Sequence, residues 1–267
     1  MSGAKGVVLR IVQYGLSDVL RSRWLAAYAL FFLVATEALL RFGGAGPRSL
    51  LALMNVILLV IPLVTVVFGT MYLYHAREFI ELLLAQPVSR RQLFAGLYLG
   101  ITIALAVGFV VGAGTPLAAR MFGSAAFRTT AASLLGAGLA LTAVFSAVAL
   151  YLTVHIQDRV RGLGAAIGVW LGTAVLYDGL VLLLATMLAD YPLERPLLGL
   201  MLANPVDLAR VALLLQFDVS ALMGYTGAVF ESFFGTAGGL AVAALALAAW
   251  VAVPLWLGLR GFQRKDF

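Results

Sequence analysis

Six long apolar segments constrain the fold of this chain more than any other feature of its sequence. A helix of roughly 20 residues is about 30 Å long, which matches the hydrocarbon thickness of a bilayer. Because lipid offers no hydrogen-bond partners, a segment that crosses it must satisfy its own backbone groups, as a helix does. The sequence therefore predicts six membrane-spanning helices, near residues 24–40, 50–73, 93–113, 130–154, 163–188 and 236–259.

The composition supports the same fold class. Hydrophobic residues make up 63% of the chain and charged residues 11%, with a mean hydropathy of +1.04, which excludes an ordinary soluble domain. We therefore predict an all-α polytopic membrane protein, with residues 1–267 forming a single transmembrane domain. Cysteine is absent, so a disulfide framework and thiolate metal sites are excluded.

The basic residues indicate how the chain is oriented. They lie at the ends of the apolar segments, so the net charge of +6 indicates membrane topology and not nucleic-acid binding. Alternate connections hold twelve Lys and Arg residues on one side of the membrane and six on the other. By the positive-inside rule, both termini and the connection 74–93 lie in the cytoplasm. Apolar residues at helical spacing over 6–23 predict an amphipathic helix in the membrane interface, leading into the first span.

The connection 74–93, YHAREFIELLLAQPVSRRQL, is the densest patch of charge between two spans. Over about residues 76–91 we expect an amphipathic helix too short to cross a bilayer, closed by a turn at Pro87 and Ser89. Its exposed face is available to a soluble partner. The residues concerned are the polar Arg77, Glu78, Glu81, Gln86, Arg90 and Arg91 and the apolar Phe79 and Leu82.

The last external connection, residues 189–235, is the one large piece outside the predicted spans. Asn204, Pro205 and Asp207 predict the start of a helix, with an N-cap, a proline in the first turn and a carboxylate near the positive end of the helix dipole. The amphipathic run that follows has Asp207 and Arg210 on its polar side. Two interpretations stand: a helix on the outer membrane surface, or a docking surface for an external partner that includes Asn204, Asp207 and Arg210.

Three polar residues are predicted at membrane depth: Asp178 in the fifth span, Glu37 near the outer end of the first, and Asn55 in the second. A carboxylate that faces a cavity in a membrane binds a cation, a proton or a polar group of a substrate, so these residues are candidates for a substrate path. The alternative is structural. In that case Asp178 pairs within the bundle or reaches the outer water, and Glu37 lies among lipid headgroups.

Glycine spacing predicts close packing of helices. Glycines four residues apart occur at 96/100, 108/112 and 235/239, and the fifth span carries Gly164, Gly168, Gly172 and Gly179 on one side. Such faces let helices approach closely within a bundle or across a homodimer.

The sequence shows no catalytic or metal-binding motif. His75 and His155 lie at the ends of spans, without the neighbouring ligand spacing of a metal site. No GxxxxGK[ST] loop is present to hold nucleotide phosphates, so ATP-driven work requires another subunit. We predict no catalysis and no cofactor in this chain. An intramembrane enzyme is an alternative, with Asp178 and Glu37 as the single candidate acid–base pair.

The order of these features resembles a known family. The interfacial helix, six spans with both ends inside, the connection ELLLAQPVSRRQLFAGLYLG, the external NPVDLARV and the terminal RGFQRKDF are similar to type-two exporter permeases of ABC transporters. More narrowly, the chain resembles NosY-like permeases, the copper-processing permease subunits of the nitrous oxide reductase maturation transporter. The likeness covers nearly the whole chain.

The resemblance implies a homodimer in the inner membrane, bound from the cytoplasm by two copies of an ABC ATPase subunit that hold ATP and Mg²⁺. The helix at about residues 76–86 would couple the ATPase to the spans through the charged and apolar side chains named above. An external or periplasmic accessory protein would join at 189–235. The implied cargo is a sulfur-containing or metal-related species used to build a copper site.

The chain departs from the family in one place. Family members often carry a Gly-Glu-Arg-Glu run and a Gly-Thr pair before the Leu run, where this chain reads HAREFIELLL. Amphipathicity and charge are kept, so the coupling role is still implied. A general exporter of another cargo, and a scaffold that transmits motion without moving cargo, are the alternatives to the copper-enzyme role.

Overall fold

A computed structural model describes residues 19, 22–44, 46–84, 88–120, 125–187, 199–214 and 237–264. The predicted interfacial helix lies almost wholly outside the described residues. Gln86, Pro87 and most of the connection 189–235 also lie outside them.

The predicted fold class is confirmed. The described residues form helices and turns with no strand, and six helices are long and apolar enough to cross a membrane. Four of them cover a predicted segment in full, and the fifth and sixth overlap the predicted segments 163–188 and 236–259 over most of their length. Their bounds are Arg23–Phe42, Pro47–His75, Arg90–Ala119, Ala125–His155, Arg159–Leu184 and Ala241–Arg264.

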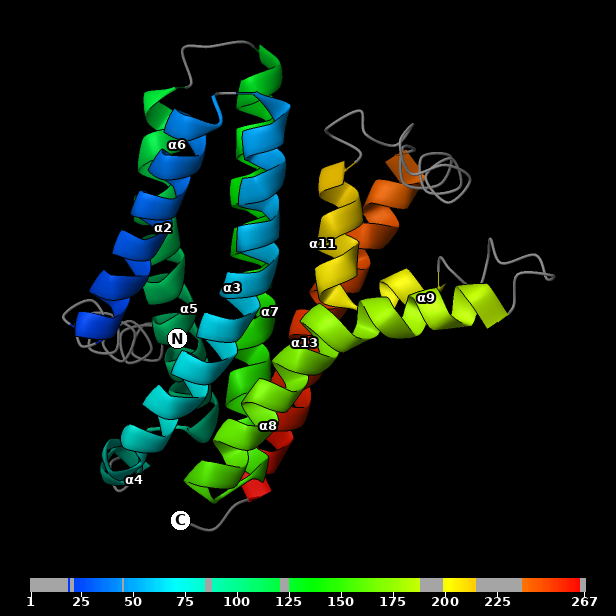
Figure 1. Cartoon of the computed structure of the whole chain (residues 1–267). Coiled ribbons are helices and arrows are strands. Elements are labelled where there is room, and N and C mark those ends of the chain that lie inside the picture. Colours follow the sequence, from blue (N-terminus) through cyan, green and yellow to red (C-terminus); the bar gives the residue numbers. More distant parts are fainter. Residues whose placement is uncertain are drawn as a thin grey trace.

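The bounds of the elements in the first half are Arg23–Phe42 for α2, Pro47–His75 for α3, Arg77–Leu84 for α4, Arg90–Phe109 for α5, Val110–Gly114 for the π-helical turn η1 and Thr115–Ala119 for α6. α2, α3 and α5 run along the bundle in alternating directions (Figure 1). α4 lies at one end, between α3 and α5, and we refer to this end as the α4 end. η1 and α6 carry the chain to the opposite end.

The remaining elements are Ala125–His155 for α7, Arg159–Leu171 for α8, Gly172–Leu176 for the π-helical turn η2, Tyr177–Met187 for α9, Pro205–Leu214 for α11 and Ala237–Arg264 for α13. α7 is central: about half of its residues are buried, and it packs on α3, α5 and α13. α13 ends at the α4 end of the bundle (Figure 1).

Short polar residues begin three of these helices, as expected from local sequence. The Oγ atoms of Ser22 and Ser89 accept hydrogen bonds from backbone N–H groups at the starts of α2 and α5. Asp158 does the same for α8, where its Oδ1 accepts from the Arg161 N–H at 2.7 Å. Each cap satisfies an N–H group that has no partner inside its own helix.

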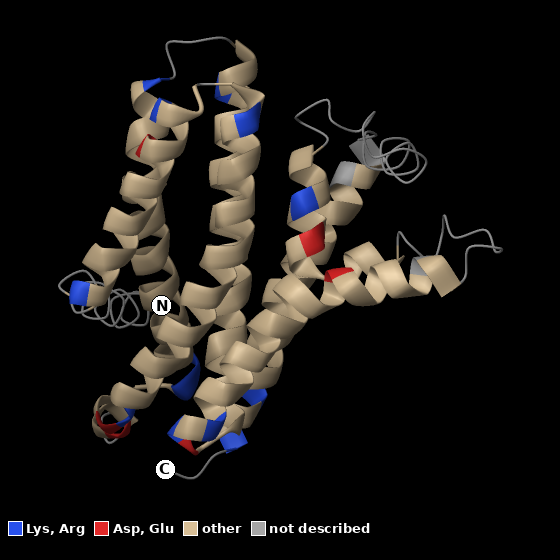
Figure 2. Cartoon of the chain, viewed as in Figure 1, with Lys and Arg blue, Asp and Glu red and all other residues tan. Residues whose placement is uncertain are grey.

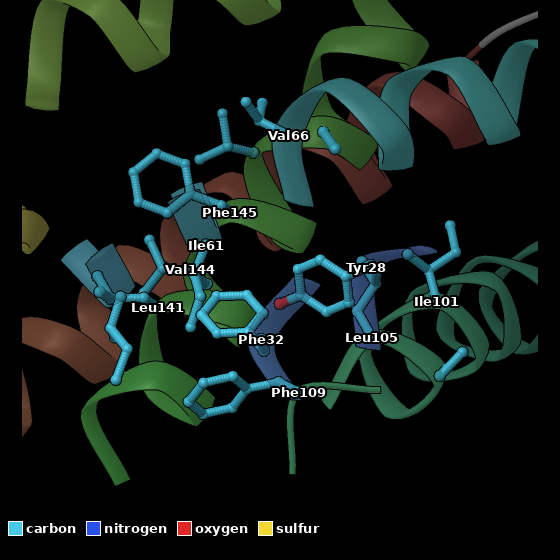
Figure 3. Close-up of a cluster of buried hydrophobic side chains, with 14 of the residues drawn as sticks. Tyr28, Phe32, Ile61, Val66, Ile101, Leu105, Phe109, Leu141, Val144 and Phe145 are labelled. Atoms are coloured by element: carbon cyan, nitrogen blue, oxygen red, sulfur yellow. The ribbon is translucent and has the colours of Figure 1, made fainter. Parts of the chain in front are cut away.

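Aromatic and aliphatic side chains fill the core between α2, α3, α5 and α7 (Figure 3). Phe32 and Phe109 meet edge to face, with ring centroids 5.1 Å apart, and both are fully buried. Ile61, Leu141 and Phe145 are buried in the same cluster. Helices in lipid gain little from hydrophobic association, so this close van der Waals packing holds the bundle together.

Glycines allow the closest helix contacts. A Cβ atom at Gly112 would overlap the backbone of α2 at Ala29, and one at Gly108 would meet Leu25. The close packing predicted for this pair is therefore confirmed between α5–η1 and α2. In contrast, Gly164 and Gly168 of the fifth span have no atom of the described chain within 4 Å of such a Cβ.

The fifth span bends at η2, where the sequence predicted one continuous helix. α8 lies against the bundle, and beyond η2 the helix α9 turns away from it (Figure 1). Gly162 and Ala166 in α8 and Ala174 in η2 are buried, whereas no described residue of α9 is. A π-helical turn inserts one extra residue per turn and so redirects a helix without breaking it.

α11 differs from the surface helix that the sequence favoured. Seven of its ten residues are buried, and it packs on α3, α7 and α13. The apolar residues of this short helix point to all sides of it: Val206, Leu208, Val211 and Leu213 do not share one face. The helix therefore packs within the bundle.

Two glycines of α7 make a matched test of this packing. We expect Gly138→Ala to destabilise the protein by roughly 1–3 kcal/mol, because the added methyl would overlap the buried ring of Phe109. Gly136→Ala, two residues away with open space around it, is expected to be neutral or slightly stabilising. Thermal unfolding in detergent measures both, and equal losses would contradict the packing described here.

Candidate functional site

Most charged residues of the described chain lie in three places (Figure 2). Two are the ends of the bundle, and the third lies between them, where α9 meets α11. Most residues predicted to be functional lie at the α4 end or in this middle group.

α4 buries one side chain and exposes the opposite face. Ile80 is buried beside a small cavity lined also by α5, α7 and α13, whereas Glu78, Glu81 and Leu82 are exposed, Leu82 to 68%. Arg77 Nε donates to Glu81 Oε1 at 3.2 Å, an exposed i,i+4 pair worth roughly 0.3–0.5 kcal/mol. The open face therefore presents a leucine flanked by carboxylates.

The two arginines that begin α5 have different environments. Arg91 is exposed, as predicted for a residue that contacts a partner. Arg90 Nη1 instead donates to the backbone carbonyl of Gln263 at 2.8 Å and to that of Phe262 at 3.5 Å. Carbonyls in the last turn of a helix lack partners within it, and a cation there suits the helix dipole. Arg90 thus ties the start of α5 to the end of α13.

A second link joins the end of α3 to the start of α8. Tyr74 Oη donates to the Ile156 carbonyl at 2.7 Å, in the turn between α7 and α8. Gly162 lies against the Tyr74 ring, where a Cβ would overlap it. Tyr74, in the last turn of α3, thus ties the end of that helix to the start of the fifth span.

A groove of about 830 Å³ opens beside α4. Its lining is mainly apolar and comes from α2, α3, α4 and α8; Trp24, Phe68, Met71 and Ile167 are among the lining residues. Phe79, predicted as an apolar contact to a partner, faces this groove and is half-buried. The aromatic side of α4 thus faces the groove, and its charged side is open.

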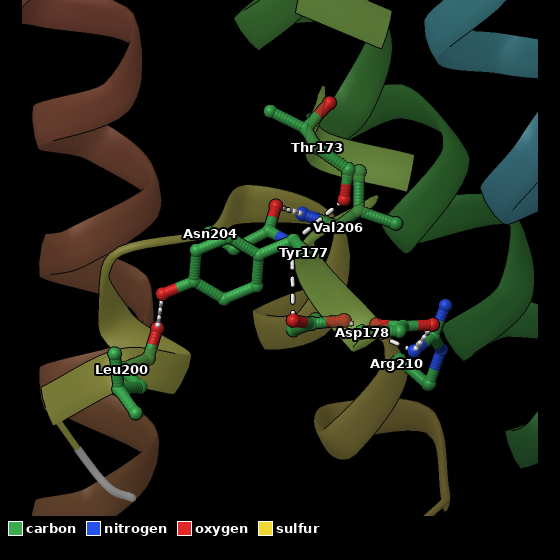
Figure 4. Close-up of polar contacts among 8 residues, drawn as sticks. Thr173, Tyr177, Asp178, Leu200, Asn204, Val206 and Arg210 are labelled. Carbon is green, nitrogen blue, oxygen red and sulfur yellow. Dashed lines mark hydrogen bonds and ion pairs between the residues drawn. The ribbon is translucent and has the colours of Figure 1, made fainter. Parts of the chain in front are cut away.

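The middle group is a polar joint between the fifth span and α11 (Figure 4). Arg210 Nη1 donates to Asp178 Oδ2 at 2.6 Å and to Asp207 Oδ1 at 3.0 Å. Tyr177 Oη donates to the Leu200 carbonyl at 2.6 Å. The joint brings together Asp178, predicted at membrane depth, and two residues predicted to dock an external partner.

Asn204 holds the centre of this joint and is 1% exposed. Its Nδ2 donates to the Thr173 carbonyl in η2 at 2.7 Å and to Asp207 Oδ2 at 3.0 Å. Its Oδ1 accepts from the Val206 N–H, so Asn204 also caps α11, as the sequence predicted. One side chain thereby joins the start of α11 to the bend of the fifth span.

The inner side of the joint, at Asn204 and Asp207, is buried. Trp250 lies near the middle of the sixth span, and its Nε1 donates to the carbonyl of Leu202, two residues before Asn204. Asp207 is 6% exposed, and burial raises its pKa to about 7, with a further upward contribution from the Asp178 carboxylate. Arg210 and Asn204 act in the opposite direction. Asn204 and Asp207 are therefore not open to a docked protein in this arrangement, while Arg210 is half-buried.

The other two residues of the predicted substrate path lie elsewhere. Glu37 forms a two-pronged ion pair with Arg120, at 2.8 and 2.9 Å, which ties α2 to the end of α6. Asn55 is exposed on α3. The structure thus places Asp178, Glu37 and Asn55 in three separate environments.

The histidines bond within their own helices. His75 Nδ1 lies 2.8 Å from the Met71 carbonyl, and His155 Nδ1 lies 2.9 Å from the Tyr151 carbonyl. In the part of the chain that the structure describes, no group of three or more His, Asp and Glu side chains is placed to hold a metal ion.

The sequence missed Tyr74, Thr173 and Tyr177 as parts of these sites. Tyr74 acts through its hydroxyl at the end of the second span, and Tyr177 acts through its hydroxyl directly after the bend of the fifth span. Thr173 acts through its backbone carbonyl at that bend. A tyrosine at a helix end beside a polar turn is a weak signal, and a carbonyl freed by a π-helical turn has none in the sequence.

Comparison with known proteins identifies a family and two named relatives. The model of a family described as ABC-2 family transporter protein matches residues 9–267. A Pseudomonas aeruginosa protein named "Probable ABC transporter permease protein NosY" is 30% identical over 277 residues, covering 94% of each chain. A Stutzerimonas stutzeri protein of the same name is 28% identical over 281 residues, covering 97% of this chain and 98% of the relative.

The neighbouring arginines of α5 give a second matched test. Arg90→Ala is expected to destabilise the protein by roughly 1.5–3 kcal/mol, because carbonyls at the end of α13 lose a charged donor. Arg91→Ala is expected to stay within about 0.5 kcal/mol of the parent, since Arg91 is exposed. Thermal unfolding of the purified protein measures both, and a stable Arg90→Ala protein would show that the contact contributes little.

Proposed function

The chain belongs to the ABC-2 family of transporter proteins, and from this premise we propose that it couples ATP hydrolysis in a separate subunit to movement across the inner membrane. It is a multi-pass membrane protein and an ABC transporter permease subunit. The observation that supports the coupling role most directly is the open face of α4, with Glu78, Glu81 and Leu82 exposed beside Arg91.

In this proposal α4 is the coupling helix and the α4 end is cytoplasmic. The positive-inside count supports that orientation. An exposed leucine between carboxylates suits a partner surface that offers an apolar pocket with a basic rim. ATP and Mg²⁺ would be held by two copies of the ATPase, and this chain would add no catalytic group.

The path of motion follows the two links at the α4 end. A push on α4 would pass through Tyr74 to the turn before α8, and through Arg90 to the end of α13. Both routes lead to the spans that are packed least within one chain. The fifth and sixth spans would therefore move first, against the central helices α3 and α7.

A homodimer fits the exposed surface of the fifth span. The side of α8 that carries Gly164 and Gly168 is open, and Leu171 and Val175 are exposed beside them. Small residues allow two helices to approach closely in lipid. The groove beside α4 would then face the space between the two copies and form part of the cargo path.

The cargo and external partner come from the family resemblance. It implies maturation of a copper enzyme of the nitrous oxide reductase type, with an external accessory protein bound at 189–235. The names of the two relatives agree with the permease role and say no more about cargo. A general exporter of another cargo is the second candidate, and a scaffold that transmits motion without transport is the third.

Substitutions on α4 test the coupling role. Glu81→Lys and Leu82→Asp are expected to weaken ATPase binding by about tenfold, or roughly 1.4 kcal/mol, and to abolish the stimulation of its activity, because both side chains lie on the open face of α4. Membrane insertion should be unchanged, since neither side chain is fully buried. Co-purification of the tagged chain with its ATPase, followed by an ATP hydrolysis assay, measures this.

Arg41→Glu is the matched control, because it reverses an exposed charge at the end opposite α4. It should leave ATPase binding intact. Unchanged binding and stimulation in both α4 variants would remove the coupling assignment. An external protein recovered with the complex would favour the copper-enzyme role over a general exporter.

Single cysteines test the homodimer, since the chain has none of its own. Leu171→Cys is expected to give a covalent dimer when membranes are oxidised, because Leu171 lies beside the open glycine face. Leu245→Cys, at a more exposed position on α13, is expected to stay monomeric. Equal cross-linking of the two variants would rule out a seam on the fifth span.

A further inference from the structure

The polar joint has more acidic than basic side chains. Two carboxylates, on Asp178 and Asp207, accept hydrogen bonds from the same nitrogen of Arg210. The two carboxylates are therefore close to each other, and the single guanidinium of Arg210 lies between them. With both carboxylates ionised, the joint has one more negative charge than positive.

The other helices around the joint bring no charge to balance it. The described charged and histidine residues of α3, α7 and α13 lie in the first or last two turns of each helix. The remaining polar groups at the joint are the neutral Asn204 and the Tyr177 hydroxyl, which donates to a backbone carbonyl. The excess charge is thus uncompensated within the described chain.

An uncompensated charge at this depth is costly. Asp207 is almost fully buried, and a buried carboxylate next to a second one is more stable when one of the two is protonated. Aspartate pairs that share a site take up a single proton for this reason.

We propose that the joint between the fifth span and α11 is a proton-binding site, in which one proton is held on Asp207 beside the Asp178 carboxylate. The proton neutralises the excess charge, and Arg210 then balances the remaining carboxylate. The raised pKa of Asp207 agrees with this assignment. Asp178 is the more exposed carboxylate of the joint, and Asp207 is the buried one.

The site links protonation to the position of α11. Asp178 belongs to α9 and Asp207 to α11, so loss of the proton places like charges on two different elements. Repulsion between them loosens the contact that holds α11 against the bend of the fifth span. The joint is thus tightest when the proton is bound.

Infrared spectroscopy of the full chain in lipid nanodiscs tests the site without reference to transport. A protonated carboxyl group has a C=O stretch that a carboxylate lacks. We expect this band to be present in the parent protein at about pH 5 and to disappear with a midpoint near pH 7. Asp207→Asn should abolish the titrating band, and Glu37→Gln, which changes a carboxylate paired with Arg120 away from the joint, should leave it unchanged.

Asp178→Asn provides a second variant should Asp207→Asn fail to fold. Removing the neighbouring negative charge is expected to shift the midpoint to lower pH by about one unit or more. A parent protein with no band that titrates between about pH 5 and 9, or an unchanged midpoint in Asp178→Asn, would overturn the proposal. Neither result would bear on the binding of an ATPase to α4.

The pH dependence of stability gives an independent readout. The folded joint holds a proton that an unfolded aspartate releases at about pH 4, so the stabilisation is complete below that pH and is lost as the pH rises to about 7. The melting temperature of the parent protein should therefore fall over this range. In Asp207→Asn the fall should be much reduced, and an undiminished fall would contradict the assignment.

Discussion

Close contact between α7 and its neighbours is the interaction on which the rest of the structure depends. In a bilayer, helices are not driven together by water, so they associate where their surfaces allow many atoms to touch. Gly138 leaves room for the Phe109 ring against α7, and Phe109 in turn meets Phe32 of α2. Three helices thus meet at one aromatic contact, and α3 completes it with Ile61. This rigid centre is what the less buried fifth and sixth spans can move against.

Three polar contacts among the described residues lie at helix ends or at a bend. Tyr74 and Arg90 act at the α4 end, and Asn204 acts at the bend of the fifth span. Each pairs a side chain with a backbone carbonyl that its own helix leaves unsatisfied, which is costly to break in a medium of low dielectric constant. In the proposed function these contacts transmit motion from α4. The same physics makes the joint at Asn204 sensitive to a proton, because one arginine faces two carboxylates there.

The backbone groups of the fifth span are hydrogen-bonded, yet few of its side chains pack against other described helices. Its hydrogen bonds are made within the helix, with a π-helical turn at Gly172–Leu176, and its side chains are mostly exposed. At the open glycines 164 and 168, an added Cβ would have no atom of another described element within 4 Å. Lipid or a second copy must cover them, and their small size favours another helix in the homodimer that we propose.

Apolar length and local capping, both readable in the sequence, determined the six spans, the amphipathic α4 and the start of α11 at Asn204. They are local properties, because a helix in lipid must satisfy its backbone within one segment. The partners of individual side chains were decided by tertiary structure. Only the fold brings Asp178 to Arg210, 32 positions away in sequence, and aligns Arg90 with the last turn of α13. Spacing along a helix shows which residues share a face, but it carries no record of where the chain bends or returns, and those bends create the joint.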